Sequence, residues 1–394
     1  MSDATKLRTA LTGTATRREI RQQPDVWRET SRILREARGA LDAFLAPLLA
    51  RENLCIVLTG AGTSAFIGQI AAPSLGAQLG RRVEAVATTD LVSHPGTYLP
   101  KDVPTLLVSF ARSGDSPEST AATALADQLL DEVSHLIVTC NPDGALNRAH
   151  ASRPGSFVLL MPERSLDDGF AMTSSFTSML LSVLLAFRGD DEAAVDALAV
   201  AGEQLLAEEE RIAELAATVP HRLVYLGGGP LVGLARESAL KTLELSAGQV
   251  VAYFDSPLSF RHGPKAVLDA RSLAVVYRSA DPYSAAYDED IIKELRATLG
   301  SERVLTVSAG RSDARAEVDG TDWELAGLEG LDDAYLAVAY VVFAQLFALY
   351  CSVALGLTPD NPFPDGGVNR VVKGVVIHPL IGTPVPIRVA EPRR

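Results

Sequence analysis

Three ionisable residues, Glu237, Lys241 and Glu244, are spaced so that a helix would carry all of them on one face. Two carboxyl groups beside an amine can take up and return a proton, which is general acid–base chemistry. The same spacing is also typical of a solvated salt-bridge face. The surrounding residues are small and apolar, and the segment follows the turn Gly227–Gly229. We therefore favour a buried, functional row.

A histidine, His262, lies between Arg261 and the pair Gly263-Pro264, outside any predicted helix or strand. Histidine is the side chain whose ordinary pKa lies nearest neutrality, so it suits proton transfer. A loop histidine held by structural hydrogen bonds explains the same residues equally well.

Two strand-like runs end in turns rich in hydroxyl groups and glycine, Leu58–Ser64 (LTGAGTS) and Ser109–Ser119 (SFARSGDSPES). Glycine lets the backbone approach a ligand, and the free N–H groups of a following helix suit a phosphate. The first turn has neither the glycine spacing of a dinucleotide fingerprint nor the lysine of a Walker loop. Each turn alone is also adequate as a helix cap. Together they predict an anion cradle made of Gly62, Thr63, Ser64, Arg112, Ser113 and Ser116.

These residues need a scaffold that brings distant turns together, and the chain alternates strand-like and helical runs. The strands predicted first are Leu54–Thr59, Val83–Ala87, Thr105–Ser109 and Leu136–Thr139. The alternation predicts an α/β fold with an open, mostly parallel sheet flanked by helices. Ligands bind such sheets at the carboxyl ends of the strands, where both hydroxyl-rich turns fall.

The pattern then recurs. Gly229 follows Gly62 by 167 residues, Ser279 follows Ser113 by 166, and Arg303 follows His135 by 168, each within a similar run. Three matches at nearly one offset predict an internal duplication. We expect a helical extension over 1–50, a first α/β domain over 51–200, a second over 215–358, and a tail over 359–394 with a short strand, Val371–His378.

The composition sets limits on partners and compartment. The 394 residues carry a net charge of −13, so the surface repels nucleic acid and anionic membranes. Three separated cysteines in apolar runs suit a reducing compartment, and no metal-ligand spacing or secretory signal is present, so we expect a cytoplasmic protein. Ala334–Leu357 is long and apolar enough to span a bilayer, but Gln345, Ser352 and three tyrosines favour a buried core helix.

As an ordered set these motifs resemble the sugar isomerase (SIS) superfamily. The resemblance is strongest to its group of galactosamine-6-phosphate deaminases and tagatose-6-phosphate ketose–aldose isomerases. It covers nearly the whole chain and is most specific in SFARSGDSPES, in ESALKTLE followed by RHGP, and in LTPDNPFPDGGVNRVVK. It implies two tandem SIS domains of the doubly wound, flavodoxin-like type, and chemistry that needs no cofactor or metal.

The resemblance also implies roles. Glu244 is the base between C1 and C2 of the sugar, and His262 is the ring-opening group donated by a neighbouring subunit. Glu237 and Lys241 match positions that orient the sugar and the base. Ser64, Ser113 and Ser116, with Thr63 and nearby backbone, hold the phosphate, although Ala111 and Arg112 replace a serine and a glutamine of the related glucosamine-6-phosphate synthase. The tail supplies Asn369 and Lys373 near the site, Lys373 one residue out of register with the family's lysine. One site per subunit and a homodimer or dimer of dimers follow.

The function expected is therefore a phosphosugar aldose–ketose isomerase, deaminating when the substrate carries a 2-amino group, as in galactosamine-6-phosphate. A plain ketose–aldose isomerase of a hexose phosphate is the first alternative, and a non-catalytic phosphosugar sensor is the second. A Rossmann-type oxidoreductase lacks its glycine fingerprint, and amidotransfer lacks a glutaminase domain and its N-terminal cysteine.

Overall fold

The computed structural model describes residue 7 and residues 9–310, 321–372 and 374–381. Two sheets dominate it, each of five parallel strands. In the first sheet the order is β2-β1-β3-β4-β5. Its strands are β1 (Cys55–Gly60), β2 (Val83–Ala87), β3 (Thr105–Ala111), β4 (Val133–Thr139) and β5 (Ser156–Leu160).

The second sheet repeats this order as β7-β6-β8-β9-β10, again with every pair parallel. Its strands are β6 (Arg222–Leu226), β7 (Val251–Asp255), β8 (Ser272–Tyr277), β9 (Val304–Ala309) and β10 (Asp322–Leu325). Two sheets with one connectivity confirm the predicted α/β class and the duplication. The sequence did not reveal β5, β7 and β10, which are short strands at sheet edges with half-exposed or polar residues.

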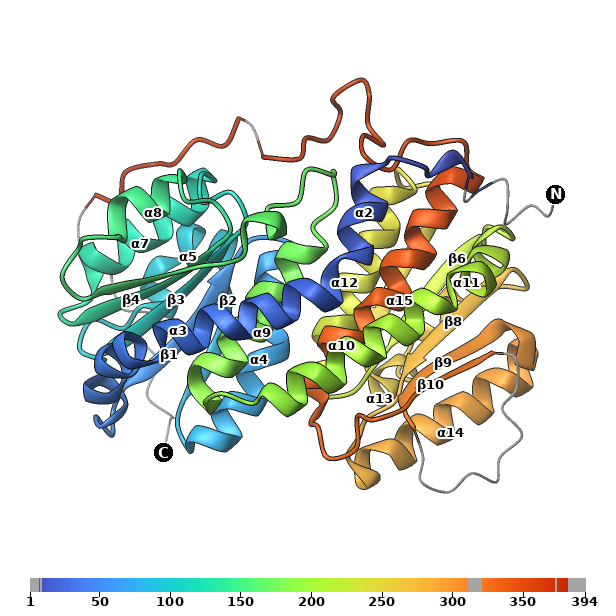
Figure 1. The fold of residues 1–394 in the computed structure, drawn as a ribbon, viewed down its shortest axis with the longest axis horizontal. Helices are drawn as coiled ribbons and strands as arrows, with labels where there is room; N and C mark the ends of the chain where they lie inside the picture. Colours follow the sequence, from blue (N-terminus) through green and yellow to red (C-terminus); the bar gives the residue numbers. More distant parts are fainter. Residues whose placement is uncertain (1–6, 8, 311–320, 373, 382–394) are drawn as a thin grey trace, which may run out of the picture.

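Helices surround the sheets and fill the space between them. In Figure 1 the first sheet lies on the left and the second on the right, with α4, α9, α10, α12 and α15 in the centre. The α-helices are α2 (Ala15–Arg21), α3 (Gln23–Leu49), α4 (Thr63–Leu79), α5 (Thr88–Ser93), α6 (Pro95–Tyr98), α7 (Pro117–Leu129), α8 (Ala145–His150), α9 (Ser174–Arg188), α10 (Glu192–Ala207), α11 (Glu209–Ala216), α12 (Pro230–Leu245), α13 (Pro257–Phe260), α14 (Pro282–Leu299) and α15 (Asp333–Ala354). Short 3-10 turns occupy Glu163–Ser165, Pro264–Val267 and Ser301–Arg303.

Helix α15 is long and apolar enough to cross a membrane, yet 94% of its most apolar stretch is buried inside the protein. It packs on α10, α11 and α12, and its buried residues belong to the same hydrophobic core as those of both sheets. It is therefore the core helix that the sequence favoured. The three cysteines are buried and free, also as expected.

Helices α4 and α12, one from each copy, cross at close range. A Cβ built on Gly233 of α12 would lie 2.7 Å from Ile70 Cγ1 and 3.0 Å from the Ile70 backbone nitrogen of α4. Only glycine allows this approach, and it brings α12 against the helix that follows the first hydroxyl-rich turn.

The tail after α15 runs along the top edge of the molecule in Figure 1, from the end of α15 towards α7 and α8. The strand predicted at Val371–His378 is wrong: no described residue of that range is in a strand. The reason is that the tail does not pair with an edge strand, and Val372 and Val376 are 52% and 71% exposed. The domain boundaries predicted above remain a proposal.

Candidate active site

The first hydroxyl-rich turn joins β1 to α4. A Cβ on Gly60 would lie 2.6 Å from Ser64 backbone atoms, so glycine is required for the turn to close. Gly62 has φ 54° and ψ −127°, a conformation that favours glycine, and it precedes the first residue of α4. No side chain caps this helix start, so Thr63 and Ser64, both buried, keep their hydroxyl groups for other partners.

The second turn joins β3 to α7 and includes Arg112, Ser113 and Ser116. Ser116 is the N-cap of α7, and its hydroxyl accepts a hydrogen bond from the Ser119 backbone N–H at 3.2 Å. Ser116 therefore acts as a helix cap, which was the alternative to ligand binding that the sequence left open. It does not exclude ligand binding, because Ser113, Ser116 and Ser119 all line one cavity.

That cavity has a volume of about 120 Å³ and lies where the two turns meet, at the carboxyl ends of the adjacent strands β1 and β3. It is the switch point of a doubly wound sheet, where ligands bind. Hydroxyl and guanidinium groups dominate its polar lining, and three tail residues cover it. The lining residues are Ala61, Ser64, Phe110, Ala111, Arg112, Ser113, Ser116, Ser119, Met172, Arg370, Val371 and Val372.

Arg112 is the buried cation of the cavity, with 7% of its surface exposed. Its Nη2 donates to the backbone carbonyl of Arg370 at 3.0 Å, and its Nη1 has no hydrogen-bond partner among the described residues. Burial lowers the pKa of the Arg112 guanidinium, and the nearby charge of Arg370 lowers it further, while Asp167 and Glu244 oppose the shift. The cavity is therefore lined by two basic residues and holds a buried N–H donor without a hydrogen-bond partner among the described residues.

The predicted row on α12 exists, and it is buried. Lys241 is fully buried, and its Nζ lies 2.5 Å from Glu244 Oε2 and 3.5 Å from Glu237 Oε1. The same Nζ donates to Thr63 Oγ1 at 3.0 Å. Because Thr63 adjoins Ser64, this bond connects the row of the second copy to the cradle of the first. The solvated salt-bridge alternative is excluded for Glu237 and Lys241.

Burial sets the protonation of the row. It raises the pKa of Glu237 to about 8, with Lys241 opposing and Glu244 adding to the effect. Burial alone would lower the pKa of Lys241, but the two carboxylates outweigh it and the pKa lies above its ordinary value. Glu237 is thus held largely neutral near pH 7, which leaves the Lys241 ammonium paired with Glu244. Glu244 is the member of the row that reaches solvent, with 24% of its side chain exposed.

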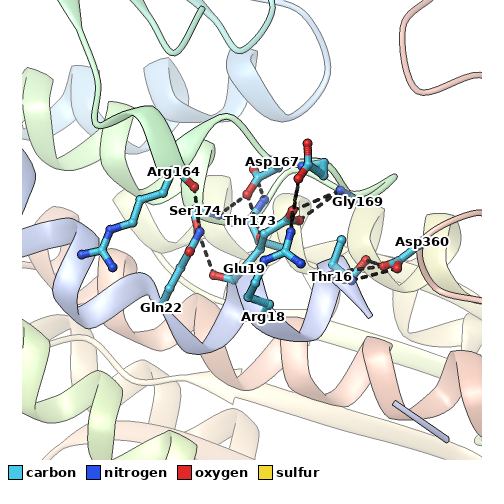
Figure 2. Close-up of polar contacts among 12 residues, drawn as sticks. Thr16, Arg18, Glu19, Gln22, Arg164, Asp167, Gly169, Thr173, Ser174 and Asp360 are labelled. Atoms are coloured by element: carbon cyan, nitrogen blue, oxygen red, sulfur yellow. Dashed lines mark hydrogen bonds and ion pairs between the residues drawn. The ribbon is translucent and has the colours of Figure 1, made fainter. Parts of the chain in front are cut away.

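A buried acid, Asp167, fixes the wall that carries Met172. Its Oδ2 accepts from the backbone N–H groups of Thr173 and Ser175, and its Oδ1 from that of Ser174. Figure 2 shows this group beside Glu19 of α2, which accepts from the backbone N–H groups of Asp168 and Gly169. Burial, reinforced by Asp167, raises the pKa of Glu19 to about 7.

Three predicted site residues are not gathered here. His262 is exposed between α13 and Pro264–Val267, and its ring makes no hydrogen bond among the described residues. Asn369 donates to the Gly366 carbonyl at 3.3 Å and does not line the cavity. Lys373 lies outside the described residues. The tail motif predicted to close over the site contains Arg370, which lines the cavity. Sequence reasoning did not single out Met172 as a lining residue or Asp167 as the acid that holds the start of α9, and neither residue carried a sequence signal.

Comparison with known proteins decides the family. Residues 48–188 match the model of the SIS domain. The AgaS protein of Streptomyces coelicolor is 58% identical over 368 residues, which cover 92% of this chain and 95% of the relative. This chain belongs to the AgaS group of the SIS-domain family.

Two further AgaS-group proteins extend the match. D-galactosamine-6-phosphate deaminase AgaS of Shewanella sp. (strain ANA-3) is 43% identical over 93% of this chain and 92% of its own. The crystal structure of tagatose-6-phosphate ketose/aldose isomerase from Escherichia coli superposes with a TM-score of 0.86 at 44% identity, covering 94% of this chain and 98% of that one. Because the superposition covers 94% of this chain, it includes residues of both sheets, and this AgaS-group chain shares their architecture with the E. coli protein.

Proposed function

We propose that this protein is a deaminating aldose–ketose isomerase of an amino sugar 6-phosphate, with D-galactosamine-6-phosphate as the first substrate to test. The observation that carries the proposal is the bond from Lys241 to Thr63. It places a buried acid–base row beside an electropositive cavity of phosphate size. The names of the AgaS relatives support the substrate class.

Phosphate binding is the first task of the site. The hydroxyl groups of Ser64, Ser113 and Ser116 and the guanidinium of Arg112 would hold the phosphate, with Gly62 and Thr63 shaping the turn. Anchoring at C6 provides binding energy remote from the reacting carbons and fixes the open-chain sugar. The reacting end then lies towards Lys241 and Glu244.

Ring opening requires a proton donor and acceptor, and we assign it to His262 of the partner subunit. His262 of the same chain is exposed and makes no hydrogen bond to the row, which suits donation across an interface. We therefore propose a homodimer or a dimer of dimers in the cytoplasm. Asn369 and Lys373 remain proposed contacts from the tail.

Proton transfer between C2 and C1 is assigned to Glu244. Its carboxylate removes the C2 proton next to the C1 carbonyl, which gives an enolamine, and returns a proton to C1. The product carries an imine at C2 and a hydroxymethyl group at C1. Water adds to C2, the C–N bond breaks, and ammonia leaves, so that one water is consumed and a ketose 6-phosphate remains. Lys241 holds Glu244 in place, and Glu237 supports Lys241.

A plain ketose–aldose isomerase is the second candidate, because the E. coli structure that this chain resembles bears that name. An ammonia-release assay separates the two. We would test galactosamine-6-phosphate, glucosamine-6-phosphate and tagatose-6-phosphate on the wild type and on Glu244→Gln.

Ammonia from an amino sugar phosphate, lost in Glu244→Gln, is the expected result. Glu244-dependent interconversion of aldose and ketose without ammonia would favour the plain isomerase. Retained phosphosugar binding with no turnover of any of the three compounds would sink both enzymatic proposals and favour a sensor.

A further inference from the structure

Two arginines, Arg112 and Arg370, line the small cavity, and no carboxylate is among its lining residues. Arg112 enters from the first sheet and Arg370 from the tail. The charge of the exposed Arg370 acts unfavourably on the buried Arg112 guanidinium, and an anion between the two arginines would offset this repulsion. The Arg112 Nη1 is buried and has no hydrogen-bond partner among the described residues, so it is able to donate to such an anion.

Asp167 and Glu244 act favourably on the Arg112 charge through space, but no hydrogen bond joins either acid to Arg112 among the described residues. The oxygens of Asp167 accept from three backbone N–H groups and from the hydroxyl groups of Thr173 and Ser175. Its hydrogen-bonding capacity is therefore used in holding the start of α9, as Figure 2 shows for the contacts with Thr173 and Ser174. The buried Nη1 of Arg112 is therefore left able to donate to a bound anion.

The tail that carries Arg370 is attached at both sides of the cavity. Upstream, Asp360 accepts from the backbone N–H groups of Ala15 and Thr16, each at 2.8 Å. Downstream, Gln128 Nε2 of α7 donates to the Leu380 carbonyl at 3.2 Å. Between these points the bond from Arg112 to the Arg370 carbonyl holds the tail on the cavity.

We propose that Arg370 is a phosphate-binding residue, and that Arg112 both contacts the same phosphate and positions the tail through the Arg370 carbonyl. The inference deepens the proposed function: it rests on a phosphorylated substrate and names the residues that make the phosphate obligatory. A dianionic phosphate would accept from both guanidinium groups and from the serine hydroxyls, whereas an unphosphorylated sugar would leave two cations facing each other.

Direct binding of inorganic phosphate tests this without any assumption about the reaction. Isothermal titration calorimetry would compare the wild type with Arg370→Ala, Arg370→Lys and Arg112→Gln. Arg32→Ala, which changes an exposed arginine on α3, is the matched control. A lost charge-assisted hydrogen bond weakens binding by about 10- to 100-fold, which we expect for Arg370→Ala. Arg370→Lys keeps the charge without the planar fork and should recover part of the loss.

The positioning role of Arg112 has its own readout. Phosphate should slow hydrogen exchange of the tail amides at 368–372 in the wild type and not in Arg112→Gln. Equal protection in the two proteins would show that Arg112 does not hold the tail. Phosphate affinity of Arg370→Ala within twofold of the wild type would overturn the assignment of Arg370.

Turnover then separates this inference from the proposed function. If the wild type binds phosphate through Arg370 but releases no ammonia, the phosphate assignment stands and the deaminase proposal fails. If ammonia is released equally well by the wild type and Arg370→Ala, the enzyme proposal stands and Arg370 is overturned.

Discussion

The two copies of the α/β unit share one turn and use it differently. Gly62 and Gly229 have nearly identical dihedral angles, φ 54° and ψ −127° against φ 53° and ψ −125°. Gly60 and Gly227 are both closed against the following helix, where an added Cβ would lie 2.6 Å from backbone atoms. The residues that follow are Thr63-Ser64 in the first copy and Pro230-Leu231 in the second. The backbone is kept, and only the first copy keeps the hydroxyl groups.

The second turn differs in the same sense. In the first copy Ser113 faces the cavity. In the second copy the matching Ser279 donates its hydroxyl to Asp333 at 2.6 Å and its backbone N–H to Asp288 at 2.9 Å. In the second copy, carboxylates of the chain itself therefore accept the hydrogen bonds of this serine. In the first copy, we propose that the matching serine donates to a bound anion. The second cradle has become part of the scaffold.

The helix that follows the first turn of each copy shows the opposite difference, because only the second copy carries ionisable residues there. Glu237, Lys241 and Glu244 of α12 match Ile70, Ser74 and Ala77 of α4 at the same offset. Each copy thus keeps one half of a site, and the close crossing of α4 and α12 joins the halves. The proposed site takes one half from each copy, so we expect one site per chain.

The largest predicted effect, on kcat/KM, comes from replacing Ser64 of the first copy by the residue that the second copy has at the matching position. Ser64→Leu introduces the residue found at the matching position 231, fills the cavity and removes a phosphate donor. We expect kcat/KM for the phosphosugar to fall about 1000-fold, near the upper end of what one lost donor costs. Steady-state ammonia release measures it, with circular dichroism to check folding. A folded variant within tenfold of wild type would contradict the division between the copies.

The next effect concerns the row that only the second copy carries. Lys241→Met removes the buried cation that lies between Glu237 and the half-buried Glu244, and it should lower the free energy of unfolding by about 3 kcal/mol. Urea denaturation measures it. The double variant Lys241→Met/Glu244→Gln should recover at least about 1 kcal/mol, because the neutral amide needs no counter-charge. No recovery would mean that the loss in Lys241→Met does not come from the unpaired charge of Glu244.

We expect the loss of unfolding free energy at acid pH to come mainly from the first copy. This copy has a buried pair of histidines at the end of its sheet opposite the anion cradle. The rings of His135 and His150 lie 4.8 Å apart, with Asp127 and Arg153 facing them. In the second copy Arg303 stands where His135 does. Burial lowers the pKa of His150 to about 4, with His135 and Arg153 adding to the shift and Asp127 opposing it.

A histidine whose pKa is lowered on folding stabilises the protein above its unfolded pKa and loses that contribution as the pH falls towards 4. Between pH 7 and pH 5 the wild type should lose up to about 2 kcal/mol more unfolding free energy than His150→Gln. Urea unfolding at the two pH values gives the difference. Equal losses in the two proteins would show that His150 is not the responsible group.

Much of this comparison could be predicted from sequence, because it depends on local rules. Strand and helix periodicity located the inner strands, and helical spacing placed Glu237, Lys241 and Glu244 on one face. The edge strand β2 was predicted, but the edge strands β5, β7 and β10 and the course of the tail could not be, because they depend on what lies alongside them. Arg370 lines the cradle through a tail held by Asp360 and Arg112, at separations of 344 and 258 residues from their partners. No local pattern records such contacts.

The smallest effects come from one substitution made twice, Ser113→Ala and Ser279→Ala. Ser113 lines the cavity, so its loss should lower kcat/KM about tenfold and leave the unfolding free energy within about 0.5 kcal/mol of wild type. Ser279 donates to Asp333, so its loss should leave kcat/KM within about twofold and lower the unfolding free energy by about 1 kcal/mol. Kinetics and urea denaturation on both variants give four numbers. The reverse pattern, with Ser279 governing turnover and Ser113 governing stability, would mean that the second cradle is the one that binds ligand.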